Sequence, residues 1–464
     1  MPYRLKDGVY LVEGATRGAI LDTNSGLVYS VNGIACQIVN YRSENNTYWG
    51  QLVQMGLAET CVSSPGISAI QPLKDTERLK FVWFEVVTDD CNECCEHCYA
   101  GSMPRTYRKE MGFAENALQE LIAQPERKKM RHSDWLRLMK EAYDLGCRAG
   151  QLIGGEPFLY KGENGETLLD LAQYLVELGY TRVEIYSNGT LLTPEKVKLI
   201  KTLGVHVAIS LYSSDPSTHD LVTRTPGSHA KTMRAIQWLK EASVPLRVET
   251  VLMKRNQETI AETTALKETL DVVGRHPDPL RPKGRGVNPL LQPDFEYVVR
   301  YGLMLKPNFT AETDTVSHYS SGHSCLLGKI TVTEFGEVLP CIFSHDNVVG
   351  NVLVAPSLES VLREPVLTRI WRATKDGVMV CRDCEYRYVC FDCRPLSEGA
   401  SAGNAGYLTA PYPRCTYNPY TGEWGQGLWK VDELGYAFYD RTLAAEIQEV
   451  ARTMSESVTA QVAH

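Results

Sequence analysis

The segment from Cys91 to Cys98 constrains this chain more than any other, because it concentrates thiols in one short loop. It reads Cys-Asn-Glu-Cys-Cys-Glu-His-Cys and closely follows the apolar run 81–87. Three thiolates at the spacing C-x3-C-x2-C can bind three irons of a 4Fe–4S cluster and leave the fourth iron without a protein ligand. A second register, C-x2-C-x3-C, runs through Cys94 instead of Cys95. Spacing alone therefore leaves two possible triads.

Composition limits the class of protein and its compartment. At 464 residues the chain is expected to form two or three domains. Its net charge of −8 argues against bulk nucleic-acid binding. We expect no membrane partner, since no apolar run approaches the roughly 20 residues needed to cross a bilayer. The N-terminus also lacks an apolar signal core. We therefore expect a cytoplasmic protein whose 14 cysteines do not form a disulfide framework, and whose clustered thiols act as metal ligands or catalysts.

The pattern along the chain predicts an α/β protein with further modules at both ends. Residues 1–76 combine short strands and two helices (33–41 and 47–56) in a small, separate α+β module. Residues 77–290 alternate strands and helices, which predicts a parallel sheet with helices outside. Its strands are expected at 81–87, 149–153, 183–187, 206–211 and 246–253. The active site should then lie at the carboxyl ends of the strands.

Start and stop signals place two of the helices. Ser133 is expected to cap one helix, and Thr193-Pro194 begins another that Gly204 ends. Beyond residue 290 the alternation stops, and cysteine, proline and glycine dominate residues 291–430. Residues 431–464 are expected to form a terminal helix and a polar tail.

The order of these motifs resembles the radical S-adenosylmethionine (SAM) superfamily. Only the register through Cys91, Cys95 and Cys98 matches the family spacing, which makes Cys94 a packed bystander. The resemblance implies a partial (β/α)6 TIM barrel and a radical enzyme. In this family the cluster binds SAM and reduces it to methionine and a 5′-deoxyadenosyl radical.

The same resemblance assigns contacts with SAM. Gly154-Gly155-Glu156-Pro157 resembles the motif that binds the SAM amino group, and Arg224 lies in an element whose Arg reaches the carboxylate. Ser187 and Asn188 match a segment that contacts the ribose. The remaining expected contacts are His97, Tyr99, Ser210 and Leu252.

A second cysteine set resembles the SPASM extension of radical SAM enzymes, which carries two auxiliary 4Fe–4S clusters. By correspondence one cluster is held by Cys381, Cys384, Cys390 and Cys415. The other is held by Cys325, Cys341 and Cys393. The final pair departs from the family in having two residues, Phe391 and Asp392, between its cysteines. Zinc is the alternative, because C-x2-C pairs are ordinary zinc ligands. Cys36, Cys61 and Cys147 fit neither set and are expected to be packed thiols.

Residues 1–76 resemble the winged-helix leader-recognition element of peptide-modifying radical enzymes. The resemblance implies a maturase that abstracts hydrogen from a ribosomal precursor peptide and forms an oxidative C–C or C–S cross-link. A ferredoxin or flavodoxin would serve as reductant. An oxidative cross-link also needs a proton acceptor, for which Asp278, Asp294 and Glu296 are the candidates.

Three other functions remain open on the sequence. A small-molecule radical dehydrogenase would use the same barrel without a leader-binding module. Sulfatase maturation to formylglycine would use the same cysteine sets. A non-catalytic iron–sulfur carrier would hold clusters but would not cleave SAM. The sequence does not identify the peptide, the bond formed or the oligomeric state.

Overall fold

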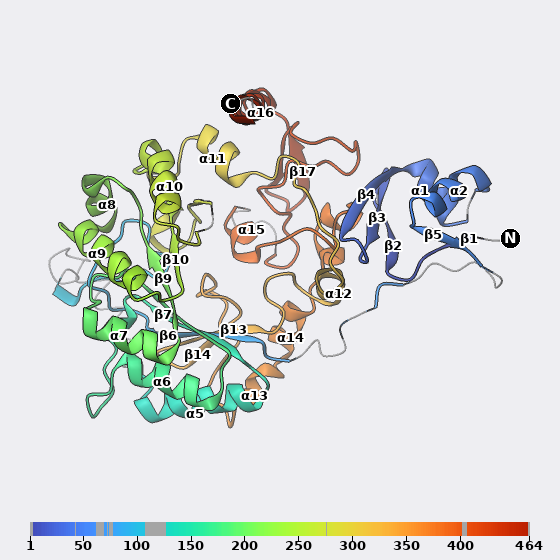
Figure 1. The fold of residues 1–464 in the computed structure, drawn as a ribbon. Coiled ribbons are helices and arrows are strands. Elements are labelled where there is room, and N and C mark those ends of the chain that lie inside the picture. The colour runs from blue at the N-terminus through green and yellow to red at the C-terminus, as the bar shows by residue number, and fades with distance from the viewer. Residues whose placement is uncertain are drawn as a thin grey trace. The chain divides into compact units, whose positions relative to one another are not determined.

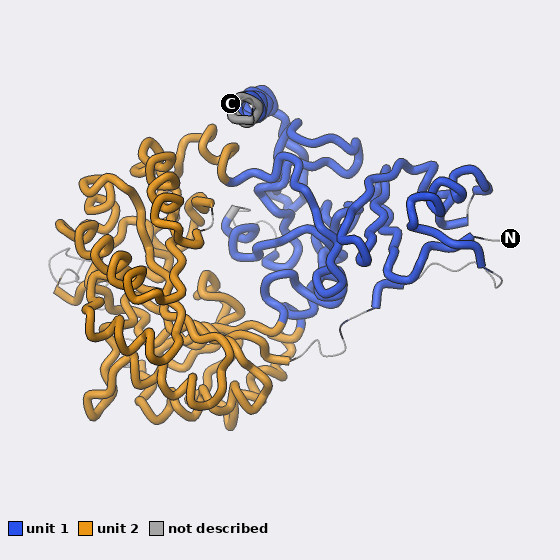
Figure 2. Tube along the Cα trace, in the orientation of Figure 1, with its two compact units in different colours: residues 1–76, 302–327, 369–464 blue, residues 77–301, 328–368 orange. Residues whose placement is uncertain are grey.

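The structure is a computed structural model that describes residues 3–41, 43–61, 69–71, 73, 78–106, 127–274, 276–400 and 406–462. The chain divides into two compact units, coloured separately in Figure 2. Unit 1 comprises residues 1–76, 302–327 and 369–464. Unit 2 comprises residues 77–301 and 328–368. Each unit thus combines segments that are far apart in the sequence.

The core of unit 2 is a parallel sheet whose strands follow one another in chain order. Neighbours pair in the order β10-β9-β8-β7-β6, and each of these pairs is parallel. The strands are β6 (Phe81–Val87), β7 (Ala149–Gly154), β8 (Arg182–Ser187), β9 (His206–Ser210) and β10 (Leu246–Glu249). β10 is followed by β11 (Val251–Leu252), which pairs in parallel with β12 (Asp278–Pro279). The predicted alternation and parallel sheet are confirmed.

Helices cover the outer face of this sheet (Figure 1). They are α5 (His132–Asp144), α6 (Leu168–Leu178), α7 (Pro194–Leu203), α8 (Pro216–Thr223), α9 (Ser228–Glu241) and α10 (Ile260–Thr269). Phe84 of β6 packs edge-on against Trp135 of α5, with ring centroids 6.4 Å apart. Because side chains alternate across a strand, the next residue, Glu85, points to the inner face of the sheet.

The start and stop signals were correct for α7, whereas the expected start of α5 was wrong. The Thr193 side chain accepts a hydrogen bond from the Lys196 amide, and Gly204 closes α7 in the left-handed region. By contrast, α5 begins one residue before Ser133, and its N-cap is Arg131. The Asp134 carboxylate accepts a hydrogen bond from the Arg131 amide, as in a capping box. Ser133 therefore lies inside the helix and is not its N-cap.

Residues 328–368 belong to unit 2, where β13 (Lys329–Thr333) extends the parallel sheet. β13 pairs in parallel with β6, and β14 (Glu337–Leu339) and β15 (Gly350–Asn351) add antiparallel strands beyond it. The range 291–430, expected as one domain, is therefore distributed over both units. The other elements of unit 2 are η1 (Pro157–Leu159), η2 (Gln257–Thr259), η3 (Gly284–Val287), η4 (Pro289–Leu291), α11 (Phe295–Gly302, whose last residue belongs to unit 1) and α13 (Leu358–Leu362).

Unit 1 joins the N-terminal module to C-terminal segments through a shared core. The module contains the antiparallel pair β1 (Tyr3–Leu5) and β5 (Ala58–Thr60) and the three-stranded sheet β2 (Val9–Glu13), β3 (Arg17–Asp22) and β4 (Leu27–Asn32). Helices α1 (Gly33–Val39) and α2 (Asn46–Gln54) lie close to the expected ranges. Val12, Ala19 and Leu21 share one buried cluster with Ala311, Val316 and Val389. The sheet of this module therefore packs against later segments of unit 1.

The rest of unit 1 consists of short elements and a terminal helix. The short elements are α12 (Thr313–Ser321), α14 (Pro365–Trp371, which starts in unit 2), η5 (Lys375–Gly377), η6 (Cys381–Asp383) and α15 (Arg394–Ala400). Strands β16 (Leu428–Val431) and β17 (Ala437–Asp440) form a hairpin before α16 (Ala444–Val462). The prediction for 431–464 found the helix but missed this hairpin. Among the described helices, none combines the length and apolarity that crossing a bilayer requires.

Replacing Trp135 by alanine should destabilise unit 2, because its side chain is fully buried between α5 and β6. We expect a loss of about 3–5 kcal/mol in the free energy of unfolding. Denaturant unfolding of the full chain measures it. Leu199→Ala on α7, where the side chain is exposed, should change stability by less than about 0.5 kcal/mol. Equal effects of the two substitutions would contradict this packing.

Candidate active site

The residues predicted from the motifs lie at the carboxyl ends of consecutive parallel strands. The cysteine loop begins four residues after β6, Gly154 ends β7, Ser187 ends β8 and Ser210 ends β9. Leu252 lies in β11 and Asp278 in β12. Since the carboxyl ends of parallel strands meet at one edge of a sheet, residues scattered over about 190 positions converge there.

Gly154 and Gly155 are required by a close approach between β7 and the start of the cysteine loop. A Cβ atom on Gly154 would lie 1.9 Å from the Val87 carbonyl oxygen, and one on Gly155 would lie 2.1 Å from that of Asp90. The Gly155 amide donates to Val87 O at 2.6 Å, and the Glu156 amide donates to Asp90 O at 3.1 Å. Only glycine permits this backbone contact at both positions.

Glu156 ties the ends of β7 and β8 together. Its carboxylate is fully buried and accepts hydrogen bonds from the Ser187 hydroxyl at 2.9 Å and from the Asn188 amide at 3.0 Å. Burial raises the pKa of Glu156 to about 7. The Asn188 side chain donates to Asn92 Oδ1 at 2.9 Å, which links the end of β8 to the cysteine loop. These predicted SAM contacts therefore also organise one another.

Arg285 holds the cysteine loop through hydrogen bonds to its backbone. Its guanidinium donates to the carbonyl oxygens of Cys95, Gly101 and Ser102 at 2.9, 2.8 and 2.8 Å. Its backbone amide donates to Cys98 O at 3.0 Å. Four backbone hydrogen bonds from one residue hold the loop that carries the thiols. The planar fork of an arginine suits this task, because its donors have fixed directions.

The two rival cysteines of the loop have different surroundings. Cys94 is buried, and its amide donates to Thr223 O at the end of α8. Cys95 is partly exposed and packs beside Tyr212 and Leu280. Cys91 and Cys98 are also partly exposed. This arrangement favours the register through Cys95, which remains a prediction.

Two buried polar atoms beside the thiols have no hydrogen-bond partner within the described part of the chain. They are His97 Nδ1 and Glu93 Oε1. The His97 ring meets Tyr212 edge-on at 4.7 Å, and burial lowers the pKa of His97 to about 3, which keeps the ring neutral. Burial raises the pKa of Glu93 to about 8. A polar ligand bound at the loop would satisfy such atoms.

The other expected SAM contacts have mixed surroundings. Leu252 is buried, and Ser210 lies 3.4 Å from the Tyr186 hydroxyl. Arg224 closes α8 in the left-handed region and is exposed. The Tyr99 ring packs against Phe343, with ring centroids 4.8 Å apart. All of them remain predictions.

Of the three candidate proton acceptors, one lies among the strand ends. Asp278 pairs with Arg281, whose guanidinium carbon lies 4.6 Å from the centroid of the Phe343 ring. Asp294 is exposed and binds Lys254 and Gln257, and Glu296 is exposed on α11. The structure therefore separates Asp278 from the other two.

A buried acid–base pair escaped the motif analysis. Glu85, fully buried in β6, lies 3.5 Å from His345 Nε2. Burial raises the pKa of Glu85. Burial lowers the pKa of His345, but the neighbouring Glu85 outweighs this effect, and the pKa of His345 is raised. A charged residue in the apolar run 81–87 was the signal that could have revealed this pair.

Unit 1 contains a small cavity lined by four of the predicted cluster cysteines. Cys381, Cys384, Cys390 and Cys415 all line it, together with Lys375, Arg387 and the aromatic residues Tyr412, Tyr417 and Trp429. The sequence separates these thiols by up to 34 positions, and the fold brings them to one enclosed space. This convergence agrees with the ligand set expected for one auxiliary cluster.

The loop between these cysteines is bonded to the turn between β2 and β3. The Ala15 amide donates to Asp383 O at 2.7 Å, and Arg387 donates to Glu13 O at 2.7 Å. A Cβ atom on Gly14 would lie 2.7 Å from the Glu385 carboxylate. The N-terminal sheet therefore supports the wall of the cysteine-lined cavity.

The second predicted auxiliary set remains an expectation. Cys325 and Cys393 belong to unit 1, and Cys341 belongs to unit 2. In the described ranges, no three His, Cys, Asp or Glu side chains converge on the point that a single metal ion would occupy. Thiolates of a 4Fe–4S cluster bind different irons and need not converge in this way.

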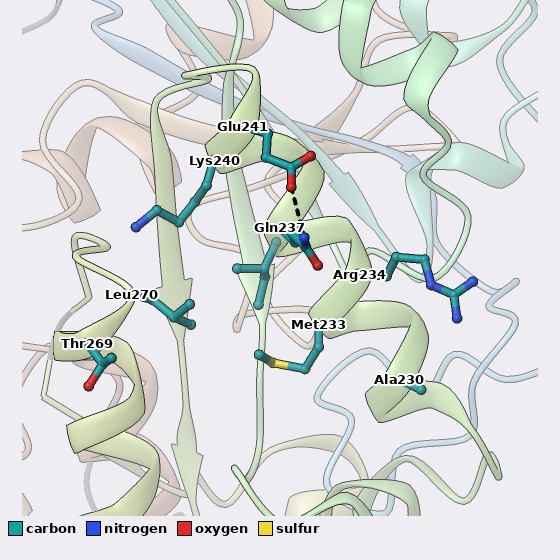
Figure 3. Close-up of a pocket in the computed structure, with 9 residues that line it drawn as sticks. Ala230, Met233, Arg234, Gln237, Lys240, Glu241, Thr269 and Leu270 are labelled. Carbon is teal, nitrogen blue, oxygen red and sulfur yellow. Dashed lines mark hydrogen bonds between the residues drawn. The ribbon is translucent and has the colours of Figure 1, made fainter.

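A hollow on the surface of unit 2 is unrelated to these residues. It has a volume of about 540 Å³ and lies along α9 beside the end of α10 (Figure 3). Arg234, Lys240 and Glu241 line it, and Gln237 donates to Glu241 within α9. It contains no cysteine and lies on the outer helices rather than at the strand ends.

Comparison with known proteins identifies the barrel. Residues 86–266 match the family model described as Radical SAM superfamily. The chain contains a radical SAM domain. The match covers the thiol loop and the ends of β7, β8 and β9, where the glycine, glutamate and serine residues converge. The α/β fold and the radical SAM class of enzyme expected from the sequence are confirmed at this level.

The proteins similar to this chain include heme synthases and proteins named for the maturation of peptides. AdoMet-dependent heme synthase from Methanosarcina barkeri is 26% identical over 375 residues, which cover 72% of this chain and 95% of that protein. The antilisterial bacteriocin subtilosin biosynthesis protein AlbA from Bacillus subtilis is 25% identical over 301 residues, covering 62% of this chain and 60% of AlbA. The structure of Streptococcus suis SuiB bound to precursor peptide SuiA aligns with a TM-score of 0.49 and 12% identity, covering 85% of this chain and 96% of that chain.

The thiol loop fits an iron–sulfur cluster with SAM. Four thiols share one loop, the unpartnered atoms of His97 and Glu93 lie beside them, and the glycines at the end of β7 bring backbone close to the loop. Thiolates are the protein ligands that such clusters use. Cys91, Cys95 and Cys98 would hold the cluster at this position.

Substituting Arg285 by lysine should weaken cluster binding, because lysine cannot reproduce the three side-chain bonds that hold the loop. We expect roughly 10–100-fold lower cluster affinity, as for other groups that orient metal ligands. Iron retained by the anaerobically reconstituted protein during a chelator challenge measures this. Arg300→Lys, on the exposed face of α11, is the matched control. Iron loss indistinguishable from that of the control would contradict the role of Arg285.

Proposed function

We propose that this radical SAM enzyme modifies a ribosomal precursor peptide, forming an oxidative C–C or C–S cross-link. The observation that best supports this proposal is that the thiol loop at the strand ends is combined with a cysteine-lined cavity elsewhere in the chain. An oxidative cross-link must remove a second electron, and an auxiliary cluster is a suitable acceptor. Relatives named for bacteriocin biosynthesis, PqqA peptide cyclisation and sporulation killing factor maturation support this substrate class.

We assign separate roles to the residues at the strand ends. Cys91, Cys95 and Cys98 hold the cluster that reductively cleaves SAM, which supplies the radical that abstracts hydrogen from the substrate. Glu156 and Asn188 keep the ends of β7 and β8 in place around the loop. Asp278 is positioned at the sheet edge to accept the proton that the cross-linked group releases.

Two auxiliary clusters complete the proposal. Cys381, Cys384, Cys390 and Cys415 hold the first, and Cys325, Cys341 and Cys393 hold the second. A ferredoxin or flavodoxin supplies electrons. None of the 14 cysteines, all of which lie in the described ranges, forms a disulfide, and we place the protein in a reducing cytoplasm.

The N-terminal sheet offers a place for the leader of the peptide. Among the described strands, β4 pairs with β3 on one side only, and each of its residues is exposed or partly exposed. An extended peptide can add to such an edge through backbone hydrogen bonds. The edge lies in the same unit as the cysteine-lined cavity.

A small-molecule substrate is the second candidate. The relatives named heme synthase align over 72% of this chain, more than the 62% aligned with AlbA. In that case the barrel would act on a heme precursor, and no peptide would be changed.

Reductive SAM cleavage tests the enzyme class and the cysteine register together. Full-length protein with SAM and dithionite should release methionine and 5′-deoxyadenosine. Cys95→Ala should abolish this release, and the adjacent Cys94→Ala should leave it largely intact, because Cys94 is buried against α8. The reverse result would assign the cluster to the other register.

Mass spectrometry separates the two substrate classes. A short precursor peptide encoded beside this gene, co-expressed with the full chain, should lose two hydrogens per cross-link. The loss should be absent with Cys95→Ala. An unchanged peptide, together with conversion of a heme precursor by the same preparation, would exclude the peptide function.

A further inference from the structure

Lys375 is a buried cation in unit 1. It begins η5, its residue is only 7% exposed, and its side chain lines the cavity that Cys381, Cys384, Cys390 and Cys415 share. Its ammonium donates to the Phe391 carbonyl oxygen at 2.9 Å, and the Cys390 thiol lies close enough to interact with it. An ammonium is costly to bury unless a negative charge compensates it.

Neighbouring cations are compensated by carboxylates, whereas Lys375 is not paired with one. Arg387 also lines the cavity, and its guanidinium binds Asp376 at 2.9 Å. Arg394 binds Asp392 at 2.5 Å. Within the described residues Lys375 forms no ion pair, and Asp392, a nearby carboxylate, is already engaged with Arg394. Three of the four thiols, those of Cys381, Cys390 and Cys415, also interact with Lys375, and as thiolates they would compensate its charge.

A cluster held by four thiolates is negatively charged and becomes more negative on reduction. Its reduction potential depends on net charge, hydrogen bonds to sulfur and exposure to solvent. A fixed positive charge in an enclosed cavity stabilises the reduced form more than the oxidised form, because charges interact strongly where water is excluded.

We propose that Lys375 is the counter-charge that raises the reduction potential of the cluster held by Cys381, Cys384, Cys390 and Cys415. The inference rests on the ligand set given under the proposed function. The step concerned is the transfer of one electron from an external reductant to the cluster, in which no bond forms or breaks. A raised potential would make this cluster a better acceptor for the electron that an oxidative reaction releases.

The experiment is a redox titration of the reconstituted full-length protein, followed by electron paramagnetic resonance. Cys384→Ala identifies the signal of this cluster, because it should remove that signal and about four irons per chain. Cys36→Ala, which removes a buried thiol outside the cavity, should remove neither.

Lys375→Met should then make one-electron reduction at least tenfold less favourable, which lowers the midpoint of that signal by about 59 mV or more. The signals of other clusters should keep their midpoints. Lys375→Arg retains the charge and should stay close to the unmodified protein. Lys306→Met is the control, because Lys306 is exposed in the same unit and water screens its charge.

The outcomes separate the inference from the proposal on which it rests. If Cys384→Ala removes neither iron nor signal, the ligand set itself is wrong and the inference falls with it. If the signal is identified and Lys375→Met leaves its midpoint unchanged, the ligand set stands and the role of Lys375 is overturned. If Lys375→Met and Lys375→Gln both fail to assemble the cluster, Lys375→Arg decides. Assembly with arginine supports the counter-charge, and failure with arginine assigns Lys375 a packing role instead.

Discussion

The close contact between the end of β7 and the start of the thiol loop is the constraint on which the site depends. Two glycines allow the backbone of β7 to touch Val87 and Asp90, where any side chain would collide. Arg285 binds the same loop through four backbone carbonyls. The loop is therefore held through its backbone, and its thiols remain available for iron. Glu156 then fixes the next strand end relative to this one.

Much of the barrel could be predicted from the sequence, because its signals are local. Apolar runs of strand length separated by capped helices indicate a parallel sheet, and Thr193-Pro194 with Gly204 marked α7 correctly. The converging motifs followed from the rule that functional residues lie at the carboxyl ends of strands. The start of α5 was misplaced because Asp134, inside the helix, accepts a hydrogen bond from the amide of the N-cap Arg131.

Features that depend on long-range packing were not visible in the sequence. Nothing local in residues 329–333 reveals that β13 pairs in parallel with β6, almost 250 positions earlier. The shared core of Val12, Val316 and Val389 likewise depends on three distant segments. Glu85 and Lys375 were overlooked for the same reason, since a single charged residue gains meaning only from what surrounds it in the fold. The two C-terminal strands are short and lacked a distinctive pattern.

The bonds between the β2–β3 turn and the loop that carries Cys381 and Cys384 have a consequence for evolution of the chain. Under the proposed function, the sheet that binds the leader would also support the cavity that accepts electrons, so it could not be exchanged freely for a sheet from another protein. Substitutions near Gly14 that tune peptide preference would shift Asp383 and Arg387 as well. Selection on substrate choice and selection on redox behaviour would then act on the same few atoms, and the two ends of the gene would have to diverge together.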